Sequence, residues 1–178
     1  MTSHGILKAA FLDFDSVGRD DLDTTMLEAA ADHWQWYGLV KADELDEVLA
    51  NVDVIVSNKV VLTDQHLSNA KCLKLVCIAA TGTNNIDLAS AVRNNIAVSN
   101  VHGYATASVV QHMFTLLLAL TTRFSQYTAA VKRGEWSKSR FFCLLDYPVR
   151  ELAGKTMGIV GYGNLGKAVA TVAEAFGM

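Results

Sequence analysis

Short apolar runs alternate with segments of helical periodicity along the first hundred residues. The runs with the composition of β-strands are AAFLDF (9–14), DVIVSN (53–58), LKLVCIAA (73–80) and IAVSN (96–100). Between them, apolar residues recur at helical spacing in TTMLEAAADHW (24–34), ADELDEVLANV (42–52), TDQHLSNA (63–70) and NIDLASAVRNN (85–95). Strands that alternate with helices form a parallel sheet, and strands that are apolar throughout have helices over both faces. We therefore predict an α/β fold with about five parallel strands, closing near residue 100.

Composition and charge argue against several classes of protein. The 178 residues are 51% hydrophobic, carry a net charge of −3 and contain no block of Lys or Arg, so nucleic acid is not an expected partner. The longest apolar stretch, 107–120, is too short to cross a bilayer and contains Gln111 and His112. The three cysteines lack metal-ligand or disulfide-framework spacing, so we expect no metal and a reducing compartment. The first residues do not resemble a secretory leader, and we expect a cytoplasmic protein without membrane contact.

One long helix is predicted over 106–132. Apolar residues at alternating steps of three and four form a single stripe, made of Val110, Met113, Leu117, Leu120, Phe124, Tyr127 and Val131. The residues between them are also largely apolar, so this helix must be covered on several sides. Two interpretations remain open: a core helix that joins two domains, or a helix whose exposed stripe of Met113, Leu117, Leu120 and Phe124 contacts a second subunit.

A glycine motif follows in KTMGIVGYGNLGKAVATVAEAFG (155–177), which predicts a strand, a tight turn and a helix. Gly161, Gly163 and Gly166 have G-x-G-x-x-G spacing, which suits a tight turn, close approach of a pyrophosphate and close packing of helix on strand, in that order. The amide groups and the dipole at the helix start favour phosphates. We therefore predict dinucleotide binding. The acidic residue that binds the ribose, about 20 positions further on, would fall at or beyond the end of this sequence, so we expect an incomplete site.

The turn after the strand at 73–80 is a candidate anion site. Ligands of open α/β sheets bind beyond the carboxyl ends of the strands. There the backbone amides of Thr81, Gly82 and Thr83 either converge on an anion such as a carboxylate, or form a plain strand-to-helix turn capped by Asn85 or Asp87.

Asn58 and Lys59 end the strand at 53–58 in the same way. Either they face the same cleft as the turn after 73–80, or Lys59 is simply solvated.

Five motifs in order resemble the N-terminal half of D-isomer-specific 2-hydroxyacid dehydrogenases, and most of all the bacterial glycerate dehydrogenase or hydroxypyruvate reductase branch. They are SNKVVLT (57–63), AATGTNNIDLA (79–89), SNVHGYATASVVQH (99–112), FCLLDYPVRELAGKTMGIVGYGNLGKAVA (142–170) and EAFGM (174–178). The resemblance implies a flavodoxin-like substrate domain over residues 1–102. Over 103–178 it implies a long arm helix and the first strand, turn and helix of a truncated Rossmann NAD-binding domain.

The resemblance also implies roles for individual residues. Thr81 and Gly82 would bind the substrate carboxylate, and Asn58 and Lys59 would border the substrate cleft. Thr106 would lie beside the cofactor, NADH or NADPH. The pyrophosphate would be held by Gly161, Gly163, Asn164, Leu165 and Gly166. The helix over 106–133 would form a homodimer.

The activity implied is interconversion of a D-2-hydroxy acid and its 2-oxo acid, of the glycerate–hydroxypyruvate or glyoxylate type, by hydride transfer. The family's catalytic Arg, Glu and His lie after the glycine motif and have no counterpart here, so we assign no catalytic residue and expect this chain to be inactive alone. His112 is expected to be a core histidine, and His102, a departure from the family pattern, a turn residue. The alternatives are a non-enzymatic NAD-sensing protein and a truncated product of such a gene.

Overall fold

The computed structural model describes residues 7–17 and 22–178. The chain divides into two compact units, Met1–His102 (unit 1) and Gly103–Met178 (unit 2).

Unit 1 is built on a five-stranded sheet of order β2-β1-β3-β4-β5, and every neighbouring pair of strands is parallel. The strands are β1 Lys8–Phe11, β2 His33–Trp36, β3 Val54–Ser57, β4 Leu75–Ile78 and β5 Ala97–Asn100. The α/β class and the flavodoxin-like strand order are thereby confirmed. In this order the chain reverses direction across the sheet between β1 and β3, which is where ligands of such folds commonly bind.

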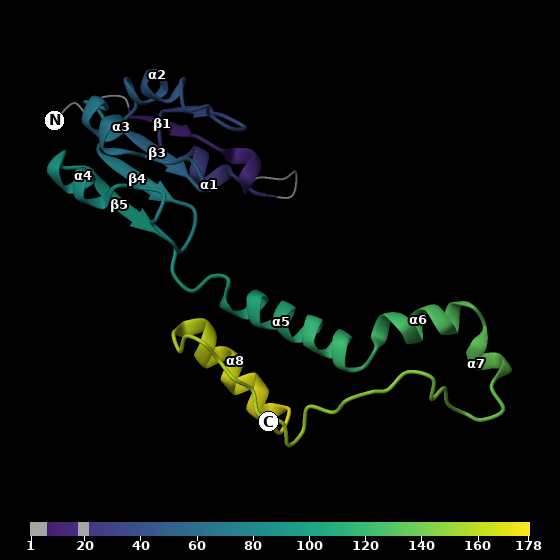
Figure 1. Ribbon diagram of the computed structural model, residues 1–178. Helices are drawn as coiled ribbons and strands as arrows, with labels where there is room; N and C mark the ends of the chain where they lie inside the picture. The colour runs from purple at the N-terminus through teal and green to yellow at the C-terminus, as the bar shows by residue number, and fades with distance from the viewer. Residues whose placement is uncertain (1–6, 18–21) are drawn as a thin grey trace. The chain divides into compact units, whose positions relative to one another are not determined.

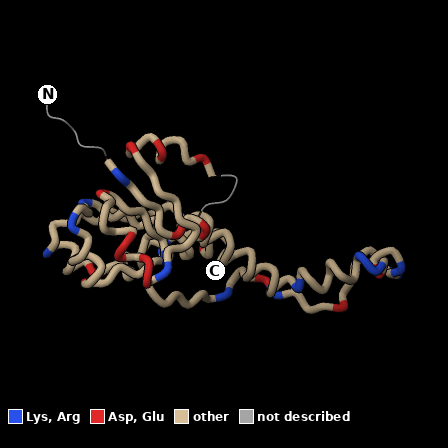
Figure 2. The backbone as a smooth tube through the Cα atoms, turned by 90° about the horizontal axis from the view of Figure 1, so that it is seen from above, with Lys and Arg blue, Asp and Glu red and all other residues tan. Residues whose placement is uncertain are grey.

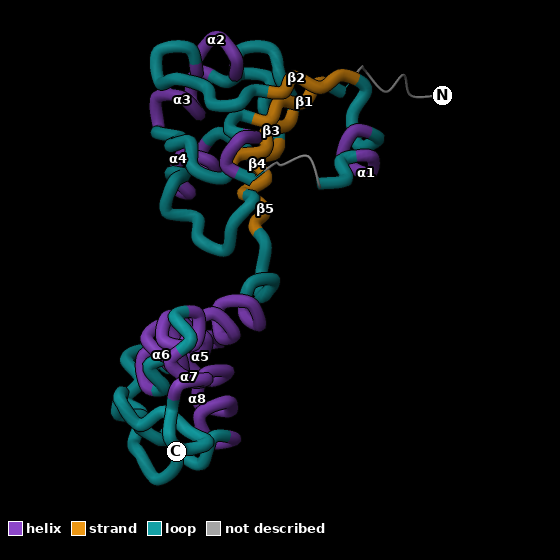
Figure 3. The backbone as a smooth tube through the Cα atoms, turned by 90° about the vertical axis from the view of Figure 1, so that its right-hand side faces the viewer, coloured by secondary structure: helices purple, strands orange, loops and turns teal. Residues whose placement is uncertain are grey.

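Three short helices cover one face of the sheet, and α1 lies on the other side (Figure 3). The helices are α1 Thr25–Glu28, α2 Leu45–Leu49, α3 Asp64–Asn69 and α4 Leu88–Arg93, with a single 3-10 turn, η1, at Phe14–Ser16. The side chains of Thr63 and Asp87 cap α3 and α4 by accepting backbone N–H groups. These caps fix where each helix begins after its strand.

The core of unit 1 lies between the sheet and α2, α3 and α4. Alternate strand residues such as Ala10, Ile55 and Val76 point into it and are fully buried, as the two-residue period of a strand requires. Leu45, Leu49, Leu67 and Ala91 enter it from the helices. This core holds the five strand ends in register, and the candidate site of unit 1 is formed by the loops that leave them.

The predicted helix over 24–34 was wrong in its second half. Helix α1 ends at Glu28, and His33–Trp36 forms the edge strand β2. Trp34 and Trp36 project on one face, with ring centroids 5.1 Å apart, and Trp36 stacks on Phe11 of β1 at 5.8 Å. Cross-strand aromatic packing of this kind outweighs the helical periodicity of the preceding residues.

Asp53 and Lys74 form an ion pair of 2.8 Å at the amino-terminal end of the sheet. The hydrogen bond from Lys74, aided by the N–H of Lys8, holds the pKa of Asp53 below its usual 3.8, and Asp53 in turn raises the pKa of Lys74 above 10.5. Because the folded-state pKa of Asp53 is lowered, its contribution to stability is present above about pH 4 and is lost as the pH falls through the folded value. The Lys74 contribution is present below about pH 10 and is lost as the pH rises.

We expect Asp53→Asn to lower the urea midpoint of unfolding at pH 7, with the difference from the native sequence shrinking toward pH 3. Urea titrations at a series of pH values measure this. Asp43→Asn is the control, because Asp43 is exposed and makes no hydrogen bond among the described residues. A deficit that is constant from pH 7 to pH 3 would contradict the assignment.

Unit 2 begins with two helices where the sequence predicted one over 106–132. They are α5 Thr106–Thr121 and α6 Phe124–Lys132, followed by α7 Glu135–Lys138 and later α8 Asn164–Ala175. The break lies at Arg123, whose φ of 57° is left-handed. Just before it, Thr121 and Thr122 donate their hydroxyl groups to the carbonyls of Leu117 and Leu118, which favours bending at the end of the helix.

Helices α5 and α8 pack side by side with their amino-terminal ends at the same end of the pair (Figure 1). Val110, Phe114 and Ala173 are buried between them, and Phe114 stacks on Phe176 at 5.4 Å. Met113 and Leu117 also pack against this cluster. Half of the stripe predicted to be exposed is therefore covered within the chain, and Leu120 and Phe124 remain exposed.

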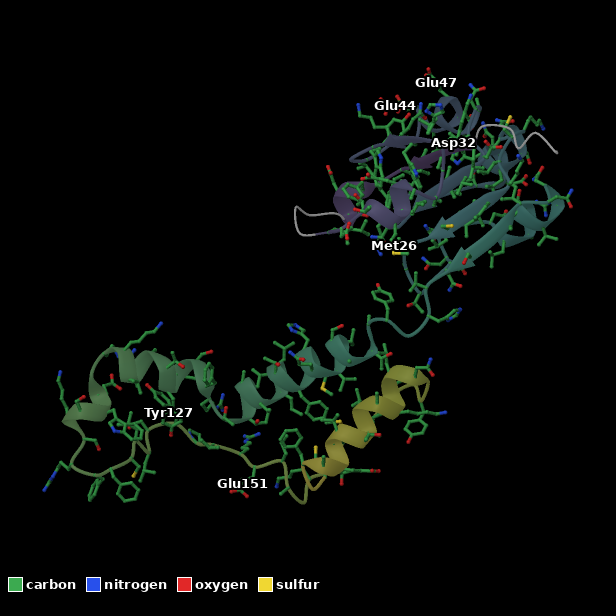
Figure 4. All side chains as sticks on the ribbon, turned by 180° about the vertical axis from the view of Figure 1, so that it is seen from behind. Met26, Asp32, Glu44, Glu47, Tyr127 and Glu151 are labelled. Carbon is green, nitrogen blue, oxygen red and sulfur yellow. The ribbon has the colours of Figure 1, made fainter. Side chains whose placement is uncertain are left out.

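The strand predicted at 155–160 is not formed. The segment is extended beside α8, with Met157 and Ile159 half-buried, but it joins no β-ladder among the described residues. A strand needs a neighbour to take its backbone hydrogen bonds, and unit 2 offers none here. The preceding loop is anchored by Tyr127, whose hydroxyl group bonds the carbonyl oxygens of Leu144 and Tyr147 at 3.1 and 2.8 Å (Figure 4).

Within 7–17 and 22–178, no helix has the length and apolar character needed to cross a membrane.

Candidate functional site

The glycine turn before α8 has a conformation that its sequence requires. Gly161 has a φ of +93°, which side chains rarely tolerate, and Gly163 forms the amino-terminal cap of the helix. A Cβ at Gly166 would lie 2.2 Å from the carbonyl oxygen of Gly161 and 3.3 Å from the side chain of Ile159. Gly166 therefore lets the helix pack directly on the turn and on the extended segment before it.

The amino-terminal end of α8 has the properties of an anion site. The first N–H groups, of Asn164, Leu165 and Gly166, have no acceptor in the described part of the chain, and no side chain caps the helix. A Cβ at Gly163 would meet nothing within 4 Å, so a ligand has room to approach the backbone there. Free donors, the helix dipole and this open space fit a pyrophosphate group.

Thr106 is the first residue of α5. Because α5 and α8 run side by side with their amino-terminal ends together (Figure 1), this residue begins its helix at the same end of unit 2 as the glycine turn. It is half-buried, and its N–H donates weakly to Gly103 at 3.5 Å.

In unit 1, the loop after β3 is tied to the loop after β1. The buried carboxylate of Asp13 accepts the N–H groups of Asn58, Lys59 and Val60. The side-chain amide of Asn58 donates to the hydroxyl of Ser16 at 3.0 Å. The side chain of Lys59 is exposed and forms no ion pair among the described residues. Asn58 therefore contributes to the frame of this strand end, whereas the ammonium group of Lys59 stays available to an anion.

The turn after β4 presents free backbone amides. No acceptor is found within residues 7–17 and 22–178 for the N–H of Thr81, Gly82 or Thr83. Thr81 and Gly82 are exposed, and the carbonyl of Thr81 accepts the side-chain amide of Asn100 at 2.7 Å. Successive backbone amides without an acceptor are a common feature of anion sites in proteins.

The structure thus brings Asn58, Lys59, Thr81 and Gly82 to the carboxyl edge of one parallel sheet in unit 1, and the glycine residues to one helix start in unit 2. Asp13 was not among the residues predicted from the sequence. The adjacent sequence DFDS (13–16) suggests only that Asp13 caps a helix. The N–H groups that its carboxylate accepts lie 45 to 47 residues further along the chain, so no local pattern indicates them.

No cluster of three potential metal ligands is found among the described residues. His112, which was expected in the core, is exposed on α5, so that prediction was wrong because its side of the helix is not covered. His102 is exposed as well. Cys72, Cys77 and Cys143 are free thiols, and burial raises the pKa of Cys77. None of these histidines and thiols is among the residues of either candidate site.

A flavodoxin-type parallel sheet, followed by a glycine turn that opens a helix, defines an α/β protein with the features of a dinucleotide-dependent enzyme. The chain belongs to the D-isomer specific 2-hydroxyacid dehydrogenase family, since the sequence model described as the catalytic domain of that family matches residues 14–174.

Several relatives match nearly all of this chain. It is 39% identical over 173 residues to a glycerate dehydrogenase of Methylorubrum extorquens, covering 96% of this chain and 54% of the relative. It is 33% identical over 175 residues to a hydroxypyruvate reductase of Blautia hydrogenotrophica, covering 97% and 54%. A D-lactate dehydrogenase of Aquifex aeolicus, solved with NAD and lactic acid, has a TM-score of 0.73 at 26% identity, covering 96% of this chain and 50% of that structure. The chain spans about half the length of the relatives it matches.

Proposed function

We propose that these residues are part of an NAD-dependent oxidoreductase that interconverts a small D-2-hydroxy acid and its 2-oxo acid. In this proposal residues 1–102 form the substrate domain, and residues 103–178 supply the arm helix and the beginning of the cofactor domain. The observation that carries it is the start of α8, where the glycine turn leaves three amides free and a Cβ at Gly166 has no room. The relatives named for glycerate and hydroxypyruvate favour the same chemistry.

The two sites would have separate tasks. The amides of Asn164, Leu165 and Gly166 would bind the pyrophosphate of NADH or NADPH, with Gly161 and Gly163 shaping the turn. The turn at Thr81 and Gly82 would hold the substrate carboxylate through its backbone amides. Lys59 adds a positive charge at the same sheet edge, and Asn58 holds its strand end in place.

When bound, the nicotinamide supplies the hydride that reduces the carbonyl carbon of the 2-oxo acid. The residues of this chain bind and orient: they fix the carboxylate in one unit and the pyrophosphate in the other. We place proton transfer and polarisation of the carbonyl outside these 178 residues, in the half that the relatives have in addition. The three free thiols favour a cytoplasmic location.

The test is a fusion of this chain to the remainder of the Methylorubrum extorquens glycerate dehydrogenase. We expect the fusion to oxidise NADH with hydroxypyruvate or glyoxylate, and the 178-residue chain alone to be slower by more than about 100-fold, because general acid catalysis by itself contributes about 10²- to 10⁴-fold. The fall in NADH absorbance with time measures both rates. Equal rates would place a proton donor within this chain and contradict the proposal.

We further propose that unit 2 forms a homodimer through the arm made of α5 and α6. Helix α5 carries no charged residue, as the uninterrupted tan of its tube shows (Figure 2). Leu120 and Phe124 are 72% and 65% exposed, and Leu116 is also exposed. A second copy would cover this apolar surface, which is of a kind that marks interaction sites on soluble proteins.

We expect the double substitution Leu120→Asp and Phe124→Asp to weaken the dimer by at least about tenfold, because large apolar residues at the centre of an interface dominate its affinity. Sedimentation velocity at several concentrations measures the association. Met26→Asp is the matched control, because Met26 is 89% exposed and belongs to unit 1, which does not contain α5 or α6 (Figure 4). A native chain that remains monomeric at high concentration would rule out this interface.

A further inference from the structure

Asp13 is a buried carboxylate at the carboxyl end of β1, with a relative exposure of 0%. It occupies the cap position of η1, yet its side chain makes no bond to that turn. The carboxylate instead accepts two bonds from the N–H of Asn58, at 2.9 and 3.1 Å, one from Lys59, and one from Val60 at 3.3 Å. One side chain therefore gathers three successive amides from the loop that leaves the neighbouring strand, β3.

The charge of Asp13 is balanced by these amides. No cationic side chain among the described residues forms an ion pair with it. Three consecutive N–H groups that point to one place form a concave anion site, and here the anion belongs to the protein itself. The loop conformation and the carboxylate depend on each other: without the carboxylate the three N–H groups would lose their common acceptor, and without the amides the buried carboxylate would be unsatisfied.

The loop that Asp13 fixes is joined to the turn after β4. The side-chain amide of Asn85 donates to the carbonyl of Val60 at 3.2 Å. The N–H of Leu62 donates to the carbonyl of Asn85 at 2.8 Å, and Leu62 and Ile86 form a parallel bridge. A continuous set of hydrogen bonds thus runs from Asp13 through the loop after β3 to the segment that carries the free amides of the turn at 81–83.

We propose that Asp13 is a positioning residue for substrate binding: it fixes the Asn58–Val60 loop and, through Asn85, the turn whose amides hold the substrate carboxylate. This proposal rests on the proposed function. Asp13 touches no substrate in it, and acts only through the backbone that it orders. A fixed backbone conformation of this turn matters because its amides bind an anion only while they point to a common centre.

The test compares Asp13→Asn with Asp53→Asn in the 178-residue chain. Asparagine keeps the shape of Asp13 but must turn an NH₂ group toward an amide N–H in either orientation, so it loses at least one acceptor. Asp53 also accepts a backbone N–H and a lysine, but at the opposite end of the sheet. The backbone amide NMR signals of Thr81, Gly82 and Thr83 are followed during titration with D-glycerate.

We expect Asp13→Asn to shift the signals of residues 58–60 and 81–87 in the free chain, and to weaken D-glycerate binding by about tenfold or more. Asp53→Asn is expected to leave the signals of residues 58–60 and 81–87 unshifted and to change the D-glycerate affinity by less than about twofold. Equal losses in the two variants, or unchanged affinity in Asp13→Asn, would overturn the proposal. If Asp13→Asn does not fold, Asn85→Ala breaks the same path one step later and is expected to shift the signals at 81–83 and weaken binding.

The proposed function and this inference fail in different ways. If D-glycerate does not move the signals of residues 81–83 in the native sequence, the assignment of the turn as the carboxylate site is wrong, and Asp13 then has no role in binding. If the ligand binds there but the Asp13→Asn signals at 81–83 match those of the native chain, the site stands and the positioning role is excluded.

Discussion

Replacing Gly166 by alanine is expected to destabilise unit 2 by about 1–3 kcal/mol and to abolish binding of NADH. The added methyl carbon would lie 2.2 Å from the carbonyl oxygen of Gly161, a backbone atom that cannot move without opening the turn. Helix propensity predicts the opposite sign, because alanine inside a helix is usually favoured over glycine by about 0.5–1 kcal/mol. The sign of the change therefore decides between steric packing and propensity.

Hydrogen exchange of the α8 amides measures the loss of packing, and fluorescence titration with NADH measures binding. The matched control is Gly158→Ala, eight residues earlier in the segment that leads to the same turn. A Cβ at Gly158 would meet nothing within 4 Å, so this variant is expected to change stability by less than about 0.5 kcal/mol. A Gly166→Ala chain as protected and as competent in NADH binding as the control would contradict the role given to this glycine.

The sequence patterns predicted those parts of the fold whose periodicity is local. The four apolar runs became β1, β3, β4 and β5, because short runs rich in apolar and β-branched residues suit the strands of a parallel sheet covered by helices. The edge strand β2 was missed, since HWQW alternates polar and aromatic residues directly after a helical segment. Its strand state depends on rings from β1, which no window around residues 33–36 contains.

The two errors in the prediction for unit 2, one long helix and a strand at 155–160, have a similar origin. The apolar stripe continues through Arg123 without interruption, so its periodicity cannot show that the backbone there is left-handed. The segment at 155–160 has the composition of a strand, but a strand is a property of a pair, and no partner strand lies among the described residues of unit 2. The glycine turn could be predicted because the requirements for glycine there are local: Gly161 has a positive φ, and a Cβ at Gly166 would meet the carbonyl oxygen of Gly161.

The residues of the candidate sites likewise fall into two groups: those that a local sequence pattern could indicate, and those that depend on contacts between distant segments. Motif spacing indicated the glycine turn, because backbone amides at a helix start need little sequence information beyond small residues. For Thr81 and Gly82 the pattern left an anion site and a plain turn both open, and the role in binding a carboxylate came from the family resemblance. Motif spacing did not indicate Asp13, whose three donors come from another strand end. Residues that shape a site from across the sheet become visible only when the strand order is known.

The order of the strands also sets the largest stability effect expected in unit 1, that of Ile55→Ala. Ile55 lies in the central strand β3, opposite Ala10 of β1 and Val76 of β4, and all three are fully buried. Ala10 offers too little volume to fill the space left by the deleted carbons, and the strands on both sides hold the backbone in place. We therefore expect the cavity to persist and the cost to be about 2–5 kcal/mol, which is a large part of the roughly 5–15 kcal/mol of a typical domain.

Urea denaturation followed by tryptophan fluorescence measures this loss, because two of the three tryptophans, Trp34 and Trp36, lie in β2 of the same unit. Val54→Ala is the control: it removes a β-branched side chain from the neighbouring position, on the other face of β3, where the residue is only half-buried. We expect Val54→Ala to lower the free energy of unfolding by less than half as much as Ile55→Ala does. Because β3 carries the loop that Asp13 fixes, Ile55→Ala should weaken D-glycerate binding only where urea begins to unfold the unit, whereas Asp13→Asn should weaken it in the fully folded chain. If Ile55→Ala reduced affinity without urea as strongly as Asp13→Asn does, the loop would be sensitive to any loss of packing beneath it, and no separate role could be given to the carboxylate.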